Sequence, residues 1–241
     1  MNTPLLNIQN LRQCYKKKTI LDDVSLAVFP AETVGLLGPN GAGKSSAFHI
    51  IAGFCRPSSG TISFANHSID DLGFEDRAKL GLAFLPQEAS IFRELSVRDN
   101  ILAPLELRSD LNATEKNDKL EHLLSAFNLE HIQSQPGFSL SGGERRRTEI
   151  ARCLTPDPKV ILLDEPFAGI DPVSINSIKQ MLQKLNQLGI SILITDHNAR
   201  DMLNICHRSY VLFNTKILAH GSSKAIINDP KVRQYYLGQN F

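Results

Sequence analysis

Four short and almost unbroken apolar runs recur along the chain, at residues 34–37, 82–85, 160–163 and 190–194. A strand that is apolar on both faces must be covered on both sides. Such strands belong in a buried, mostly parallel sheet flanked by helices. The pattern therefore predicts an α/β fold whose central sheet is built from these four runs.

Elsewhere the pattern is that of half-buried strands. Within residues 21–29 the apolar positions 24, 26 and 28 alternate with smaller residues, and 5–15 and 60–64 carry further strand signals. We expect these strands to form an antiparallel layer beside the core. Near the end of the chain, residues 209–213 and 216–220 indicate a hairpin, followed by a short helix near 223–228.

Between residues 91 and 137 the strand-like runs stop and a helical spacing replaces them. Leu120, Leu123 and Phe127 recur at this spacing, and Ser96 and residues 112–114 offer helix starts. We predict one domain over residues 1–241. Its parts are a core with an antiparallel β subdomain (1–90 and 138–241) and an inserted helical subdomain (91–137).

The amino-acid composition limits the classes of protein to which this chain can belong. The chain of 241 residues is 42% apolar, and its 26 basic residues nearly balance 25 acidic ones, so no nucleic-acid partner is expected. Four scattered cysteines predict reduced thiols in a cytosolic protein. No run approaches the ~20 apolar residues that span a bilayer, and no signal peptide is visible. We therefore expect no direct membrane insertion, and a membrane process would be served through a partner.

The first glycine-rich segment follows the run at 34–37 and opens a predicted helix. This order directs several backbone N–H groups at one spot, where the helix N-terminus adds partial positive charge. Lys44 can reach the outer phosphates of a nucleotide, and the hydroxyl of Ser45 can ligate Mg²⁺. A turn that merely caps a helix is the alternative, but the full order favours binding of a nucleoside triphosphate. The segment comprises Gly38, Pro39, Asn40, Gly41, Ala42, Gly43, Lys44, Ser45 and Ser46.

A second glycine-rich segment, Ser141, Gly142, Gly143 and Glu144, precedes a predicted helix over 145–154. Ser141 and Glu144 have capping-box spacing, which alone would explain that pair. The glycines also leave the helix N-terminus bare, so that it can approach an anion. Because one loop already holds the triphosphate, we expect this segment to meet a nucleotide held by a second copy of the chain in a two-fold dimer. The basic run 145–147 is expected to be solvated or to face that subunit.

Acidic and polar residues follow the remaining apolar runs. Asp164 and Glu165 end one strand, so that Asp164 is expected near Mg²⁺ and Glu165 beside the attacking water. His197 follows another strand and could hydrogen-bond the γ-phosphate. Gln87 follows a third, where its amide could touch Mg²⁺ or water. Open α/β sheets bind ligands at this edge, although solvated acids and a structural histidine remain the plain alternatives.

In this order the motifs resemble the ATP-binding cassette family of transport ATPases, and the likeness spans nearly the whole chain. Residues 38–46 resemble its Walker A loop, 140–144 its signature sequence and 160–164 its Walker B strand. The signature more often ends in Gln than in Glu144, and serines replace the commoner threonines after Lys44. The resemblance implies a homodimer that encloses two Mg²⁺·ATP.

The same resemblance assigns roles to single residues. It implies that Glu165 is the general base, Gln87 the Q-loop glutamine and His197 the switch histidine. It also adds Asp171, in a segment that resembles the D-loop, and Tyr15, where the family commonly places an aromatic residue that stacks on adenine. For Tyr15, an ordinary residue at a strand edge is the alternative.

Residues 85–93, 140–147 and 163–172 show a narrower resemblance, to the branch that powers lipopolysaccharide export in Gram-negative bacteria. Branched-chain amino-acid import ATPases are close relatives and remain an alternative. The resemblance implies an ATPase held at the cytoplasmic face of the inner membrane by transmembrane permease subunits. Phe92 and Arg93 are candidates for that contact, with local packing as the alternative. DNA-repair ATPases insert long coiled coils, and translation-associated cassettes normally occur in tandem, so neither class fits.

Overall fold

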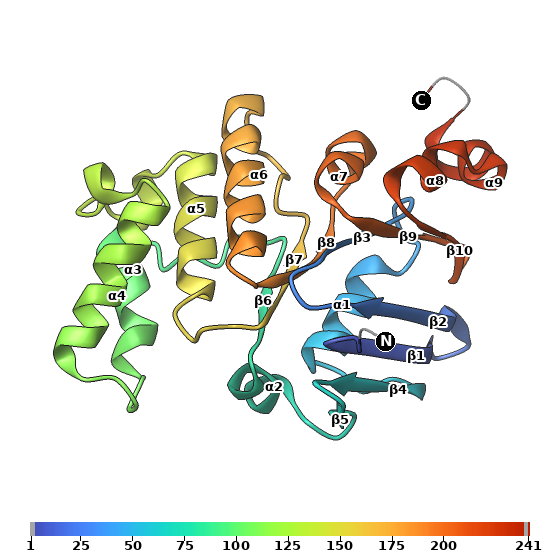
Figure 1. The fold of residues 1–241 in the computed structure, drawn as a ribbon, viewed down its shortest axis with the longest axis horizontal. Helices are drawn as coiled ribbons and strands as arrows, with labels where there is room; N and C mark the ends of the chain where they lie inside the picture. Colours follow the sequence, from blue (N-terminus) through green and yellow to red (C-terminus); the bar gives the residue numbers. More distant parts are fainter. Residues whose placement is uncertain (1–2, 239–240) are drawn as a thin grey trace.

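A six-stranded sheet forms the centre of the molecule (Figure 1). In sheet order its strands are β10 (Lys216–Gly221), β9 (Arg208–Phe213), β3 (Thr33–Leu37), β8 (Ser191–Thr195), β7 (Val160–Asp164) and β6 (Leu82–Leu85). The strands from β9 to β6 run parallel, and β10 pairs antiparallel with β9. The computed structural model describes residues 3–238 and 241. The predicted α/β class is confirmed, and the four apolar runs form β3, β6, β7 and β8, with Ile190 just before β8.

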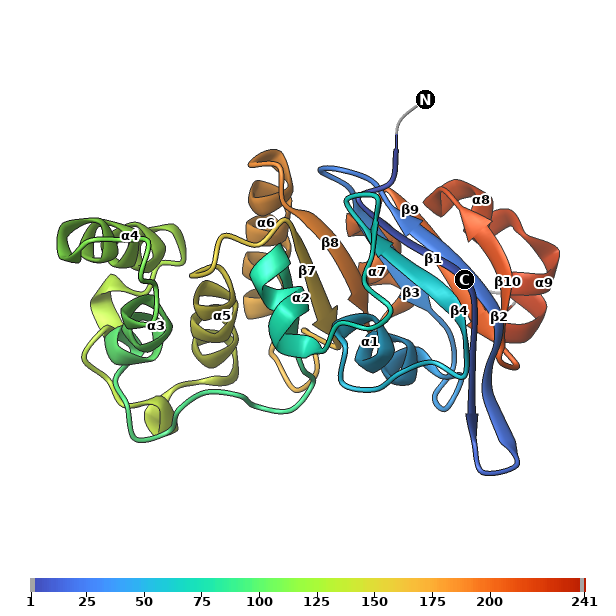
Figure 2. The ribbon, with the colours of Figure 1, turned by 90° about the horizontal axis from the view of Figure 1, so that it is seen from below.

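A second, antiparallel sheet comes from the N-terminal part of the chain. Its strands, in order, are β2 (Lys18–Val28), β1 (Leu6–Tyr15), β4 (Ser59–Phe64) and β5 (His67–Ser68). Figure 2 shows β1, β2 and β4 lying alongside one another. Helix α1 (Lys44–Ala52) packs between this sheet and the parallel sheet, because Phe48 and Ile51 are buried among residues of both. The predicted antiparallel layer is therefore present.

The insert contains two helices whose starts match the predicted positions. α3 (Val97–Glu106) begins after Ser96, whose side chain accepts a hydrogen bond from a backbone N–H of the first turn. α4 (Ala113–Ala126) begins after Asn112, which forms a capping box. The apolar side chains at helical spacing are buried, as a helix packed on one face requires. They are Leu120, Leu123, Leu124 and Phe127.

Three further helices lie beside the parallel sheet. They are α5 (Gly142–Cys153), α6 (Pro172–Gln187) and α7 (Ala199–Ile205). α5 starts three residues before the predicted helix, because its capping box places both glycines inside the first turn. It packs against α3, β6 and α6, and thereby links the helical end of the molecule to the sheet (Figure 1). The predicted subdomain boundary at residue 137 stays a prediction.

Shorter elements complete the chain. The sequence patterns indicated α8 (Ser223–Asn228), but not α2 (Phe74–Leu80) or α9 (Pro230–Val232). Short turns of 3-10 helix lie at Glu130–Ile132 and Gly137–Ser139, and one turn of π-helix lies at Arg233–Leu237. Over residues 3–238 and 241, no helix combines the length and the apolar character needed to cross a bilayer.

Candidate nucleotide-binding site

Close packing explains two glycines of the loop between β3 and α1. Gly38 has a φ of +150°, and a Cβ atom there would lie 2.2 Å from the carbonyl oxygen of Leu212. Gly43 has a φ of +108°, and a Cβ atom there would lie 2.8 Å from Cδ2 of Leu21. Any larger residue would therefore force the loop away from β9 or β2. Glycine holds the loop against both sheets.

Lys44 lies at the first position of α1 and turns back over this loop. Its buried ammonium donates hydrogen bonds to the carbonyl oxygens of Gly38 at 2.8 Å and Pro39 at 3.1 Å. Burial lowers the pKa of Lys44, and the nearby carboxylates of Glu165 and Asp164 act against that shift. Loss of solvent thus makes the charge costly, so the site favours an anionic ligand that can compensate it.

A cavity of about 360 Å³ lies beside the loop, at the C-terminal edge of the parallel strands. Gln87 reaches it from the loop after β6, Glu165 from the loop after β7 and His197 from the loop after β8. These loops leave neighbouring parallel strands, so they meet at one edge of the sheet. The lining residues are Ile20, Asn40, Gly41, Gly43, Lys44, Ser45, Ser46, Gln87, Glu165 and His197.

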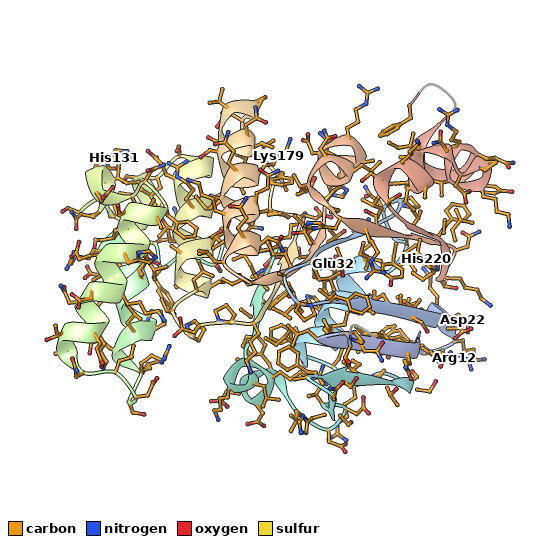
Figure 3. All side chains as sticks on the ribbon, viewed as in Figure 1. Arg12, Asp22, Glu32, His131, Lys179 and His220 are labelled. Atoms are coloured by element: carbon orange, nitrogen blue, oxygen red, sulfur yellow. The ribbon has the colours of Figure 1, made fainter. Side chains whose placement is uncertain are left out.

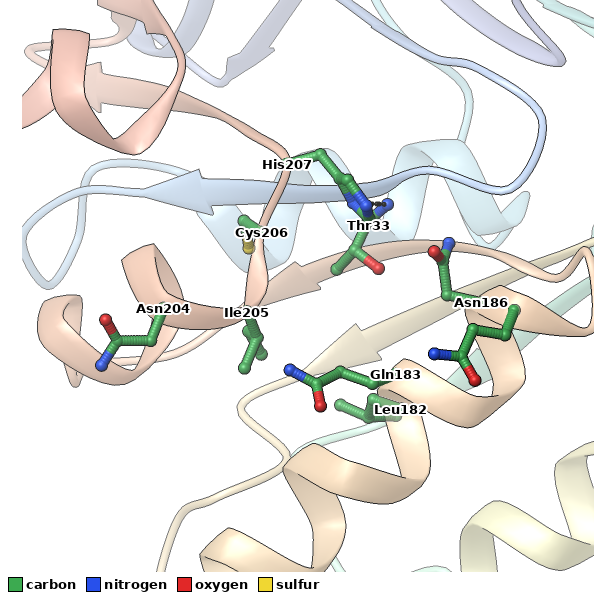
Figure 4. Close-up of a pocket in the computed structure, with 9 residues that line it drawn as sticks. Thr33, Leu182, Gln183, Asn186, Asn204, Ile205, Cys206 and His207 are labelled. Carbon is green, nitrogen blue, oxygen red and sulfur yellow. Dashed lines mark hydrogen bonds between the residues drawn. The ribbon is translucent and has the colours of Figure 1, made fainter.

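A larger cavity, of about 500 Å³, opens at the opposite edge of the sheet where β3 begins (Figure 4). Carboxamide side chains of α6, such as Gln183 and Asn186, form part of its wall. Nδ1 of His207 accepts a hydrogen bond from the backbone N–H of Thr33 at 3.0 Å. No lysine, arginine or carboxylate lines this cavity. We therefore place the candidate site in the smaller cavity, where charged groups converge on a helix N-terminus.

Asp164 is the last residue of β7 and is almost fully buried. Burial raises the pKa of its carboxyl group, and a hydrogen bond with the Ser45 side chain opposes that shift. Its Oδ1 atom is buried without a hydrogen-bond partner. A buried carboxylate oxygen with no donor is costly. This atom is therefore suited to a cation.

The oxygen donors here fit Mg²⁺, which prefers hard oxygen ligands and is usually held by one or two carboxylates together with substrate phosphates. Asp164, which interacts with the Ser45 side chain but does not itself line the cavity, could supply the carboxylate; Ser45 could supply a hydroxyl and Gln87 a side-chain amide at the cavity wall. Within the described ranges, 3–238 and 241, no cluster of three or more His, Cys, Asp or Glu side chains is arranged to hold a metal by itself.

Glu165 has an unusual backbone, with a φ of +47° in the left-handed region. Such a conformation costs about 1–3 kcal/mol in a residue other than glycine. Its N–H donates to the carbonyl oxygen of Thr195 at 2.8 Å, which holds the turn in place. Its Oε2 atom is buried and lies 2.6 Å from Nε2 of His197. The two groups are not aligned for a hydrogen bond, so this contact leaves Glu165 Oε2 without a hydrogen-bond partner.

Ser141 and Glu144 form the predicted capping box at the start of α5. The Ser141 N–H donates to Glu144 Oε2 at 2.9 Å, and hydrogen bonds from Ser141 lower the pKa of Glu144. A Cβ atom on Gly143 would lie 2.4 Å from Oγ of Ser174 on α6, so glycine is needed there for packing. Ser141, Gly142, Gly143 and Glu144 do not line the cavity of their own chain.

Asp171 and Tyr15 also lie outside the cavity wall. Asp171 caps α6, because its Oδ1 accepts hydrogen bonds from two backbone N–H groups at 3.0 Å. Its hydrogen bonds with Ser174 lower its pKa. Tyr15 ends β1 with 68% of its surface exposed, and the Lys16 ammonium lies 5.8 Å from the centre of its ring. Ile20, which the sequence patterns did not single out, lines the cavity at the start of β2.

The expectation that the basic run 145–147 is solvated or faces a second subunit is wrong for Arg146, which is buried within its own chain. Its guanidinium donates to the carbonyl oxygens of Pro86, Asp164 and Pro166 at 3.0–3.2 Å. It also pairs with Glu149 at 3.1 Å. Arg146 therefore joins the helix of the second glycine segment to the loops that carry Gln87 and Glu165. The i, i+3 spacing of Arg146 and Glu149 was the available signal.

Sequence comparisons place these features among known proteins. The family described as ABC transporter matches residues 21–168. The chain is 46% identical over 237 residues to the lipopolysaccharide export system ATP-binding protein LptB of Haemophilus influenzae. It is 47% identical over 236 residues to the protein of the same name in Escherichia coli. In both cases 98% of each chain is covered.

Solved structures show the same fold. An ATP-binding cassette of an ABC transporter, MJ1267 in its ADP conformation, matches with a TM-score of 0.87 and 28% identity, covering 98% of this chain and 100% of that one. A dimeric cassette, MJ0796 in a post-hydrolysis state bound to ADP and Pi, matches with a TM-score of 0.80 and 25% identity, covering 90% and 98%.

Proposed function

Because the chain belongs to the ABC transporter family, we propose that it is the ATP-hydrolysing subunit of a lipopolysaccharide export system. The observation that carries the proposal is the likeness to the two LptB proteins, which extends over almost the full length of both partners. A branched-chain amino-acid importer, the other candidate, is not among the relatives named above.

The phosphate loop supports ATP as the nucleotide. The first residues of α1, Lys44, Ser45 and Ser46, line the cavity, and phosphates bound there would gain from the free backbone N–H groups and the dipole of the helix N-terminus. Lys44 would exchange its bonds to Gly38 and Pro39 for bonds to phosphate oxygens. Burial disfavours the charged form of the Lys44 ammonium, and a phosphate beside it would compensate for that cost.

The remaining polar groups have separate roles in ATP hydrolysis. Ser45, Asp164 and Gln87 would hold Mg²⁺, which when bound neutralises charge on the phosphates. Glu165 orients the attacking water and accepts its proton. His197, 2.6 Å from the Glu165 carboxylate, donates a hydrogen bond toward the γ-phosphate. Tyr15 provides a surface for adenine from the end of β1.

A second copy of the chain completes the site. The segment 141–144 forms the N-terminus of α5 and has no side chain at Gly142 or Gly143, so it can approach the γ-phosphate of the opposite subunit. Asp171 lies at the start of the adjacent α6 and is exposed. A dimeric cassette is among the structures of the same fold. We therefore place two nucleotides between two antiparallel subunits.

Transmembrane permease subunits would dock beside the Gln87 loop, which places the protein at the cytoplasmic face of the inner membrane. Phe92 is 51% exposed, and its ring lies 4.8 Å from the guanidinium carbon of Arg152. Arg93 is exposed next to it. Phe138, which the sequence patterns missed, is also exposed, and its N–H donates to the carbonyl of Arg93 at 3.0 Å. Aromatic rings beside a cation are typical contact hot spots.

Purification from membranes in mild detergent tests the transport assignment. The proteins that accompany the chain would be identified by mass spectrometry. Permeases that handle lipopolysaccharide support the proposal, and amino-acid permeases overturn it.

A further inference from the structure

The loop that carries His197 is fixed at its first residue by Asp196. The carboxylate of Asp196 accepts hydrogen bonds from the backbone N–H of Phe167 at 3.0 Å and from that of Asn198 at 3.1 Å. Phe167 lies two residues after Glu165. Asp196 therefore keeps the His197 loop in register with the segment that carries Glu165.

The far end of the loop depends on a different set of contacts. Asn198 caps α7: its Oδ1 accepts from the Asp201 N–H at 3.2 Å, and its Nδ2 donates to Asp201 Oδ2 at 2.8 Å. The other oxygen of Asp201 is 2.5 Å from Nζ of Lys179. The Lys179 and Asp201 side chains are only 16% and 19% exposed. The pair is thus better shielded from solvent than an ordinary surface ion pair.

Lys179 belongs to α6, so the pair ties the His197 loop to a second element. Lys179 lies on the α7 side of α6 (Figure 3). The same helix begins at Pro172 and is capped by Asp171, eight residues earlier and about 12 Å away along the helix axis. A helix moves as a rigid unit over this length. A displacement of the Asp171 end is therefore carried to Lys179.

We infer that the Lys179–Asp201 pair is a positioning device for His197, which holds its loop to α6 and passes movement of the Asp171 segment to it. The inference rests on the proposed roles of His197 in hydrolysis and of Asp171 at the subunit boundary. Lys179 is not among the residues that line the nucleotide cavity. It acts through Asp201, the cap of α7 and the loop that precedes it.

Steady-state ATP hydrolysis by the full-length protein tests this inference. Lys179→Met keeps the apolar stem but removes the charge, and should lower kcat about tenfold with less than about a threefold change in KM for ATP. Lys179→Arg should restore most of the rate. Lys119→Met is the matched control, because Lys119 also pairs at 2.5 Å, with Asp157, and is 18% exposed, but lies on α4. Its kcat should be unchanged.

A double variant separates positioning from general stability. If Lys179 acts through His197, then adding Lys179→Met to His197→Ala should cause no further loss of kcat, because contacts in one network are not additive. Full additivity, or a wild-type kcat in folded Lys179→Met and Asp201→Asn, overturns the inference while leaving the ATPase assignment intact. Wild-type turnover of His197→Ala would instead remove the proposed role of His197 itself, and the inference with it.

Discussion

At the scale of single residues, the backbone and the carboxylate of Glu165 contact different partners. The backbone N–H is bound to the carbonyl of Thr195 at 2.8 Å, and the carboxylate lies against His197. The left-handed φ of +47° therefore depends on the main chain and not on the charge. An isosteric change of the side chain should leave the loop where it is and alter only the chemistry.

Glu165→Gln should accordingly keep ATP binding but lower turnover by about 10²–10⁴, the usual effect of losing a general base. The closed dimer should accumulate with ATP bound. Phosphate release measures the first effect, and size-exclusion chromatography with ATP and Mg²⁺ the second. A variant that hydrolyses ATP at the wild-type rate would exclude Glu165 as the base.

The buried carboxyl group of Asp164 carries an energetic cost that the proposed metal-binding role would explain. Burial raises its pKa, so the folded protein holds the proton more tightly than the unfolded chain does. By linkage, its contribution to stability is greatest at low pH and is lost as pH rises from about 4, where a free Asp ionises, through the raised value. The unpartnered Oδ1 is the structural counterpart of this cost.

Asp164→Asn should therefore stabilise the nucleotide-free protein by about 1 kcal/mol at neutral pH, within the range usual when strained functional sites are relieved. The gain should shrink toward pH 4, and ATP hydrolysis should fall sharply. Urea unfolding at several pH values provides the measurement. A gain that is independent of pH would show that ionisation of Asp164 is not its origin.

At the scale of elements, the start of α5 serves two purposes at one position. Gly143 is packed so closely against Ser174 of α6 that no Cβ atom fits, and the proposed dimer also requires it to be bare. In the proposed dimer, stability and catalysis would therefore depend on the same missing side chain. A single substitution cannot separate them, but a pair of substitutions can.

Gly143→Ala should destabilise the protein by about 1–3 kcal/mol, the usual cost of overpacking, and should also lower ATP hydrolysis. Ser174→Gly removes the atoms that clash, so the double variant should regain stability in urea unfolding. It should not regain activity if Gly143 approaches a nucleotide across the dimer. Full recovery of activity in the double variant would limit Gly143 to a packing role.

At the scale of the whole molecule, aromatic side chains are exposed on the surface near the Gln87 loop. Phe92 and Phe138 are exposed there, and a second pair, Phe54 and Phe74, stacks with ring centres 4.5 Å apart; Phe54 also lies 5.4 Å from Phe84 of β6, the strand that precedes the Gln87 loop. Exposed aromatic rings that gather in pairs are typical of surfaces that contact a partner. The arrangement supports a protein partner that covers this surface.

Phe92→Ala should weaken assembly with the membrane partner by about 30-fold or more, the effect of losing a hot spot worth about 2 kcal/mol. ATP hydrolysis by the isolated subunit should change little. Leu107→Ala serves as the control, because Leu107 is even more exposed but follows α3. Pull-down of the membrane subunits measures assembly. Equal recovery with both variants would exclude Phe92 from the interface.

Much of the fold follows from local patterns. The apolar runs became the parallel strands, and Ser96 and Asn112 cap helices as their side chains predict. The burial of Arg146 did not follow from such patterns. Nothing in the local sequence distinguishes the three consecutive arginines, and only the tertiary structure shows that the loops after β6 and β7 cover Arg146. Ile20 was missed for a related reason: an apolar residue at the start of a strand carries no local mark of a cavity.

Residue order alone thus determined the class of fold, the phosphate loop and the likeness to an ATPase family, since each is specified by a short stretch of neighbouring residues. The tertiary structure decided which distant groups meet. It alone brings Glu165 within 2.6 Å of His197 and Lys179 within 2.5 Å of Asp201. Such contacts depend on how strands are ordered in the sheet and how helices pack beside it, and no local spacing encodes that arrangement.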